Sequence, residues 1–236
     1  MFPDLISIGP FTNHTYGFFV AVGFAVGILT AVKVGKTQGV PSQQVMDMAF
    51  VMIVWAIIGS RLFYVLINFS HYKAHPLDII KIWQGGLVFS GGLVATAAAM
   101  WWYLRRHRLS FWTTGDLWAP SLALGQAIGR IGCFMAGCCY GRPTGSSWGL
   151  VFTHPKSLAP LNIPLYPTQV FEAVSGFAVF LLLIFLHGKK KFEGQVFLWY
   201  LILHSTARLF VERFRGDERG LIPGTEMSAT QLVATL

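Results

Sequence analysis

Charged residues are scarce in this chain of 236 residues: Asp, Glu, Lys and Arg together make up 12% of it. An average soluble domain carries about 25%. Apolar residues instead reach 54%, and the mean hydropathy is +0.56. These proportions exclude an ordinary soluble globular protein. They also leave few hydrophilic surfaces, so we expect no nucleic-acid partner.

The chain also lacks internal repeats, low-complexity tracts and any segment typical of a soluble domain. The first apolar stretch has no basic region before it and no A-x-A cleavage site after it, and a secretory signal peptide needs both. We therefore expect this stretch to remain in the protein as a membrane span.

Long apolar runs dominate what is present. A helix of about 20 apolar residues crosses the ~30 Å hydrocarbon layer of a bilayer. The predicted fold class is all-α, a polytopic integral membrane helical bundle that forms a single transmembrane domain over residues 1–236. A candidate seventh span begins near Met227 with "MSATQLVATL", which is too short to cross. The six clear spans are residues 16–34, 45–68, 86–104, 114–136, 169–187 and 194–212.

Basic residues gather in the loops after the first, third and fifth spans. The positive-inside rule places these loops in the cytoplasm and the N-terminus outside. The bias is moderate, because Lys and Arg also occur on the other side, and the net charge of +8 suits anionic headgroups on either face. The residues of the three loops are Lys33 and Lys36, then Arg105, Arg106 and Arg108, then Lys189, Lys190 and Lys191.

Two outer segments accompany the spans. Residues 138–168 are rich in Gly, Pro, Ser and Trp and predict a small extracytoplasmic cap with short strands around "SSWGLVF". Residues 71–84 predict a short interfacial helix with Trp83 at headgroup depth. We expect the chemistry to lie between these segments and the outer ends of the spans.

Ionisable residues inside the predicted spans are candidate functional residues. A charge at mid-bilayer costs about 2.5–3.5 kcal/mol on the insertion scale, so such residues usually face a cavity or a partner. The last span carries a helical stripe of His204, Arg208, Glu212 and Arg215. A plain Arg208–Glu212 pair with snorkelling ends would also explain this stripe. The five intramembrane candidates are Arg61, Arg130, Glu172, Arg208 and Glu212.

Arg130 needs an anion from elsewhere in the molecule or from a ligand. It lies in "GQAIGRIG", where glycines at helix–helix spacing allow neighbouring backbones to approach closely. One candidate anion is a lipid phosphate, which a guanidinium binds bidentately. The other candidate is Glu172 or Glu212 across the bundle, and the sequence leaves both open.

The stretch "GRIGCFMAGCCYGRP" resembles the signature of the prolipoprotein diacylglyceryl transferase family. The blocks "SIGPFTNHTYG", "GSRLFYVLINF", "WQGGLVFSGGL", "GDLWAP", "YPTQVFE", "RLFVERFRGD" and "MSATQ" agree with it in order. The resemblance implies about seven helices in the bacterial inner (cytoplasmic) membrane and no cofactor. It also implies an enzyme that moves diacylglycerol from phosphatidylglycerol to the lipobox cysteine thiol of an exported prolipoprotein, releasing glycerol phosphate.

The resemblance implies the site residues as well. Arg130 matches the signature arginine that engages the lipid phosphate, and Arg208 matches the essential arginine of the sixth helix. Two guanidiniums there would hold the phosphate and stabilise it as it leaves. The remaining matched positions are Tyr16 of the first-helix "YG" motif, Glu212, Arg215, and Gly141, which closes the signature.

Several polar family positions are replaced. The signature G-R-x-G-N-F-x-N-G-E has Cys133, Ala136 and Cys138 in place of Asn, Asn and Glu, while Ser90 and Tyr166 replace two histidines. The presumed general base is therefore missing. A diverged paralogue that binds anionic phospholipid or modifies another acceptor, without lipoprotein activity, is the alternative function.

His204 stands where the family usually has tyrosine. A histidine with a pKa near 6.5 could accept the thiol proton, and a neighbouring Arg208 would keep it neutral, as a base requires. We therefore include His204 among the candidate catalytic residues.

The three cysteines have four open interpretations. Cys133, Cys138 and Cys139 could pack as small apolar residues, form a disulfide between Cys133 and one of the pair, or supply a reactive thiol. Zinc is the weakest reading, because no histidine is close and ligands at adjacent positions splay apart. We predict no metal site.

Overall fold

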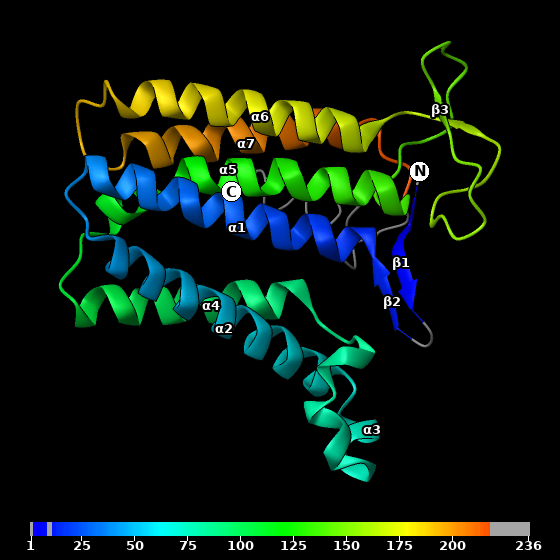
Figure 1. Ribbon diagram of the computed structural model, residues 1–236, viewed down its shortest axis with the longest axis horizontal. Coiled ribbons are helices and arrows are strands. Elements are labelled where there is room, and N and C mark those ends of the chain that lie inside the picture. Colours follow the sequence, from blue (N-terminus) through cyan, green and yellow to red (C-terminus); the bar gives the residue numbers. More distant parts are fainter. Residues whose placement is uncertain (1, 9–10, 218–236) are drawn as a thin grey trace, which may run out of the picture. The chain divides into compact units, whose positions relative to one another are not determined.

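The computed structural model describes residues 2–8 and 11–217, and this part of the chain is mostly helical (Figure 1). Two short antiparallel strand pairs, β1 (Asp4–Ile8) with β2 (Phe11–His14) and β3 (Leu150–Val151) with β4 (Pro164–Leu165), lie among the helices. The helices are α1 (Thr15–Thr37), α2 (Ser42–Ile67), α3 (Phe69–Ala74), the 3-10 helices η1 (Pro76–Ile80) and η2 (Ile82–Gln84), α4 (Phe89–Arg106), α5 (Phe111–Ala136), α6 (Thr168–His187) and α7 (Gln195–Glu212).

Each of the six apolar stretches is a helix whose ends lie within one turn of the predicted limits. Three of them, α1, α2 and α6, are long and apolar enough to cross a membrane. The predicted all-α membrane class is therefore supported at the level of helical content and apolar helices. The candidate seventh span near Met227 lies outside the described residues.

The chain forms two compact units, and the first comprises residues 1–31 and 115–236. Its helices α1, α5, α6 and α7 run alongside one another (Figure 1). Small residues permit the contacts: a Cβ on Gly23 of α1 would lie 2.8 Å from the carbonyl oxygen of Gly125 of α5, and one on Gly176 of α6 would lie 3.0 Å from Ala127 Cβ. α5 thus packs against both α1 and α6 at backbone distance.

The N-terminus of α7 is capped by a side chain from another helix. Asp116 of α5 is fully buried, and its carboxylate accepts hydrogen bonds from the backbone N–H groups of Gly194 (2.9 Å) and Phe197 (3.0 Å). Lys190 Nζ lies 3.2 Å from the same carboxylate. The first N–H groups of a helix have no hydrogen-bond partner within the helix, and Asp116 accepts from two of these groups at α7. Its negative charge also interacts favourably with the positive end of the helix dipole.

We expect Asp116→Ala to destabilise the protein by about 2 kcal/mol, because it removes a helix cap and two charge-assisted hydrogen bonds. This corresponds to a fall of roughly 4–8 °C in the melting temperature of a chain of this size. Thermal unfolding in detergent measures it. Asp47→Ala is the matched control, because Asp47 is exposed and its carboxylate accepts a hydrogen bond from the Gln43 side chain (2.9 Å) rather than from a helix N-terminus. Equal melting temperatures for the two variants would contradict the capping role.

The second unit comprises residues 32–114 and is built on the packing of α2 against α4. Glycines again set the approach. A Cβ on Gly59 would lie 2.5 Å from the carbonyl oxygen of Gly91, and one on Gly91 would lie 2.6 Å from that of Gly59. A larger residue at either position would push the two helices apart.

Arg61 of α2 is 7% exposed and bonds to backbone rather than to an anion. Its Nε donates to the carbonyl of Ile79 (2.8 Å), its Nη1 to those of Gly85 (2.7 Å) and Gly86 (3.1 Å), and its Nη2 to that of Asp78 (2.6 Å). The guanidinium thereby fixes the segment of η1 and η2. Arg61 was a candidate intramembrane site residue, and the structure gives it this structural role instead.

The segments outside the long helices contain both predicted and unpredicted structure. Residues 69–84 form α3, η1 and η2, close to the expected helix, and Trp83 is 74% exposed. The strand expected around "SSWGLVF" is β3. The β1–β2 hairpin was not predicted. Within the first unit, Asp4 of β1 pairs with Lys156 Nζ at 2.5 Å and with His14 Nδ1 at 2.9 Å.

Candidate active site

Glu172 of α6 lies at the centre of three arginines. Its Oε2 is 2.9 Å from Arg130 Nη1 of α5, and its Oε1 is 3.0 Å from Arg215 Nη1 and pairs with Arg208 Nη1 of α7. The side chain of Glu172 is 8% exposed, against 30% for Arg130 and 3% for Arg215. The ion pairs of this carboxylate therefore connect α6 to α5 and to the C-terminal end of α7.

Two further acids complete this charge cluster. Arg208 Nη2 lies 2.7 Å from Glu212 Oε2 one turn along α7, and Arg215 contacts Asp217 through Nε (2.8 Å) and Nη2 (3.1 Å). Three cations thus face three anions, which offsets the cost of burying each charge. Burial alone would lower the pKa of Arg215, but the hydrogen bond to Asp217 and the charge of Glu172 outweigh it and raise the pKa.

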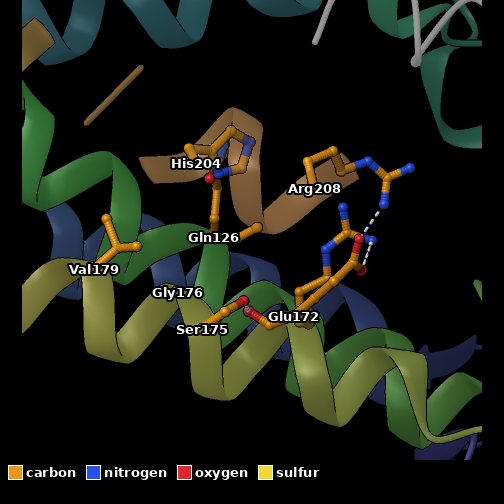
Figure 2. A pocket seen from close by; sticks show the side chains of 9 residues that line it. Gln126, Glu172, Ser175, Gly176, Val179, His204 and Arg208 are labelled. Atoms are coloured by element: carbon orange, nitrogen blue, oxygen red, sulfur yellow. Dashed lines mark hydrogen bonds and ion pairs between the residues drawn. The ribbon is translucent and has the colours of Figure 1, made fainter. Parts of the chain in front are cut away.

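A small cavity of about 40 Å³ opens beside the cluster. This space accommodates roughly three water molecules or one compact polar group. In Figure 2, Glu172 of α6 and Arg208 of α7 point toward one another at this cavity, and a dashed line marks their contact. The lining residues are Gln126, Arg130, Glu172, Ser175, Gly176, Val179, His204, Ala207 and Arg208.

Gly141 places Arg215 through the backbone. It forms an isolated antiparallel bridge with Arg215, and Arg142 N donates to the Phe214 carbonyl at 2.9 Å. A Cβ on Gly141 would lie 2.3 Å from the carbonyl oxygen of Tyr166 and 2.9 Å from that of Phe214. A glycine is required here for steric reasons, so its contribution to the site is to let the segment that carries Arg215 approach.

The structure brings together five of the seven sequence-predicted site residues. Arg130, Arg208 and His204 line the cavity, and Glu212 and Arg215 lie in the charge cluster. His204 is half-buried and stacks on the Tyr200 ring, with centroids 5.5 Å apart. Of the other two, Gly141 bridges to Arg215 as described, and Tyr16, 46% exposed at the start of α1, packs its backbone against Gly132, two residues after Arg130.

The three cysteines are unbridged, and their sulfur atoms lie within 4.8 Å of one another. The expectation that adjacent thiols splay apart is wrong. Cys139 has a left-handed backbone, with φ of 60°, which turns its side chain relative to that of Cys138. Buried side chains of α6 hold this turn: Thr168 Oγ1 donates to the Cys139 carbonyl (2.8 Å) and Gln169 Nε2 to the Cys138 carbonyl (2.9 Å).

Glu172 is the residue whose importance the sequence understated. It appeared only as an intramembrane charge and as one of two partners open to Arg130. The available signal was a lone acid in the first turns of an otherwise apolar helix. Gln126 and Ser175, which also line the cavity, carried no such signal.

Known proteins resemble this chain over nearly its whole length. The relative from Clostridium tetani (strain Massachusetts / E88) is 32% identical over 234 residues, covering 99% of this chain and 92% of the relative. Those from Trichormus variabilis and Pseudoalteromonas atlantica are both 36% identical and cover 94% of this chain, with 81% and 79% of their own length matched. All three carry the name phosphatidylglycerol–prolipoprotein diacylglyceryl transferase. A profile of the prolipoprotein diacylglyceryl transferase family matches residues 3–236, and the chain belongs to that family.

Proposed function

We propose that this protein transfers the diacylglyceryl group of phosphatidylglycerol to the lipobox cysteine thiol of prolipoprotein signal peptides. Family membership and the names of the relatives support the activity. The observation in this molecule that carries it is the charge cluster: three arginines meet at Glu172 beside a polar cavity, between helices that are otherwise apolar. Such a site suits an anionic lipid headgroup.

The phosphate of the lipid binds where Arg130 and Arg208 reach the cavity. The ion pair of Arg130 with Glu172 engages Nη1, and the side chain is 30% exposed. A guanidinium carries five N–H donors, so Arg130 can hold Glu172 and a phosphate oxygen together. The acyl chains stay in the bilayer, because a cavity of about 40 Å³ is too small for them.

The reaction makes a thioether. The cysteine sulfur attacks the glycerol carbon that carries the phosphate, an S–C bond forms, and the C–O bond to the phosphate breaks. Glycerol phosphate leaves with the electron pair. Arg130 and Arg208 stabilise the charge that gathers on its oxygens. The thiol proton goes to His204, which lines the same cavity and is the only histidine among its lining residues.

Replacing His204 by Asn tests the base. We expect turnover at neutral pH to fall about ten-fold, since a positioned base contributes at least that much and water replaces it in part. The deficit should shrink as the pH rises past ~8.5, where a thiol ionises without help. A pH profile of turnover with a lipobox peptide measures both. A deficit that stays constant with pH would exclude His204 as the base.

We propose further that all six long helices cross the bilayer and form one transmembrane domain, with residues 138–168 as an extracytoplasmic cap and the N-terminus outside. The basic loops after spans one, three and five support this orientation. Six crossings put the C-terminus outside as well. A reporter fused to the C-terminus and assayed in each compartment tests the number of crossings. Reporter activity in the cytoplasm would contradict six crossings.

A complementation experiment decides between the proposed activity and the diverged-paralogue alternative. A bacterial cell depleted of its own diacylglyceryl transferase should mature prolipoproteins again when it expresses this chain. In parallel, the purified protein in phosphatidylglycerol should produce a diacylglyceryl thioether on a lipobox peptide. Binding of phosphatidylglycerol without either product would favour the paralogue.

A further inference from the structure

The three-thiol cluster at the end of α5 takes no part in the proposed reaction. Cys133, Cys138 and Cys139 are the only cysteines in the chain. Their sulfur atoms nevertheless lie within 4.8 Å of one another, although the residues span a helix end and a turn. Packing alone does not require three sulfur atoms to converge.

The backbone is held in a strained shape that brings these thiols together. Cys139 has φ of 60°, a region that costs a non-glycine residue roughly 1–2 kcal/mol. Thr168 and Gln169, both fully buried, bond to the carbonyls of Cys139 and Cys138 and keep this conformation. Strain that the surroundings maintain is often found at ligand clamps.

The donor set identifies the class of ligand. Thiolate sulfur is soft and selects Cu(I), Zn²⁺ or iron–sulfur clusters. Within the part of the chain that the structure describes, the group of potential metal ligands contains these three cysteines and no fourth His, Cys, Asp or Glu. Structural zinc is bound by four ligands in a tetrahedron, so three thiolates are one ligand short, whereas Cu(I) takes soft thiolates and accepts three of them.

The dimensions and the charges agree with such an ion. Three sulfurs placed trigonally at about 2.3 Å from a metal would be about 4 Å apart, inside the observed separation. Three thiolates and one monovalent ion leave two negative charges. The guanidiniums of Arg130 and Arg215 both interact electrostatically with Cys139 and offset that charge.

We propose that Cys133, Cys138 and Cys139 form a trigonal site for a soft monovalent metal ion, Cu(I). Binding replaces the thiol protons, which are released to solvent, and involves no change of oxidation state. This site goes beyond the diacylglyceryl transfer and revises the prediction that the chain has no metal site. The bound ion would join the end of α5, which carries Cys133, to the turn that follows it, which carries Cys138 and Cys139.

The test titrates the full-length protein in detergent, reduced with a phosphine, with Cu(I) in competition with a chromophoric Cu(I) chelator. One Cu(I) per chain should bind, and X-ray absorption should find three sulfur neighbours. Replacing any one of the three ligands should weaken Cu(I) binding more than roughly 100-fold, in the variants Cys133→Ser, Cys138→Ser and Cys139→Ser. Losing a residue that only hydrogen-bonds to a metal ligand already costs up to about 100-fold in affinity, and losing the ligand itself should cost more. Met46→Leu, which removes an exposed sulfur elsewhere, should leave the affinity unchanged.

Maleimide labelling of the unmodified chain gives a readout that needs no variant. The partly exposed thiols of Cys138 and Cys139 should react in the metal-free protein and be protected after one equivalent of Cu(I). Sub-stoichiometric binding, affinity retained in the triple Ser variant, or labelling unaffected by Cu(I) would each overturn the proposal. Tight Zn²⁺ binding without Cu(I) binding would overturn the assignment of the ion. None of these outcomes depends on transferase activity.

Discussion

Arg130→Ala and Arg208→Ala should each lower turnover about a hundred-fold or more, and Arg130→Lys and Arg208→Lys at least ten-fold. Each arginine supplies a charge-assisted contact to the leaving phosphate in a site of low dielectric, worth roughly 2.7–4 kcal/mol by analogy with single donors that stabilise a developing anion. Lysine keeps the charge but cannot form the bidentate fork. The measurement is turnover per folded protein in defined phosphatidylglycerol with a lipobox peptide.

The lysine variants separate two roles for these arginines. If Arg130 and Arg208 only neutralise Glu172, lysine preserves that role and turnover stays near normal, which would end the phosphate-clamp proposal. Arg105→Lys is the matched control, because Arg105 is exposed in the last turn of α4. It should retain normal turnover.

Glu172→Gln should cause the largest loss of stability. Removing this carboxylate's charge leaves Arg130, Arg208 and Arg215 facing one another around a neutral side chain. Breaking a buried ion pair at one partner costs about 3–5 kcal/mol, and for a chain of this size that is roughly 6–20 °C in melting temperature. Thermal unfolding in detergent and the level of protein in the membrane measure the effect.

Two comparisons isolate the charge. Adding Arg130→Gln to Glu172→Gln should restore part of the lost stability, because it removes the cation whose ion pair was with Glu172. Glu193→Gln, at an exposed position, should change stability by no more than about 0.5 kcal/mol. A Glu172→Gln protein as stable as the Glu193→Gln protein would contradict the central role of this carboxylate.

Helix positions were predictable because apolar runs of bilayer length leave few alternatives. The ends of α5 and α7, for example, match the predicted Ala136 and Glu212 limits. The β1–β2 hairpin was missed although its pairing is local, because its strands are only five and four residues long and lead directly into the apolar run of α1. Strands this short carry too little periodicity to be distinguished from a loop.

The candidate site was predictable as a set of charges but not as a network. Sequence placed Arg208 and Glu212 one turn apart, and the structure has that pair at 2.7 Å. It could not choose between phosphate and Glu172 as the partner of Arg130, since these residues lie on different helices. The convergence of the cysteines was also hidden, because it depends on the φ angle of Cys139.

The hydrogen bonds of Arg61 have a consequence for biosynthesis. Its carbonyl partners belong to residues 17 to 25 positions later in the chain. α2 therefore leaves the ribosome while the acceptors of its arginine are still inside the exit tunnel, and a charge at the centre of a helix inserted alone costs about 2.5–3.5 kcal/mol. We therefore expect α2 to enter the lipid together with the η1–η2 segment rather than before it.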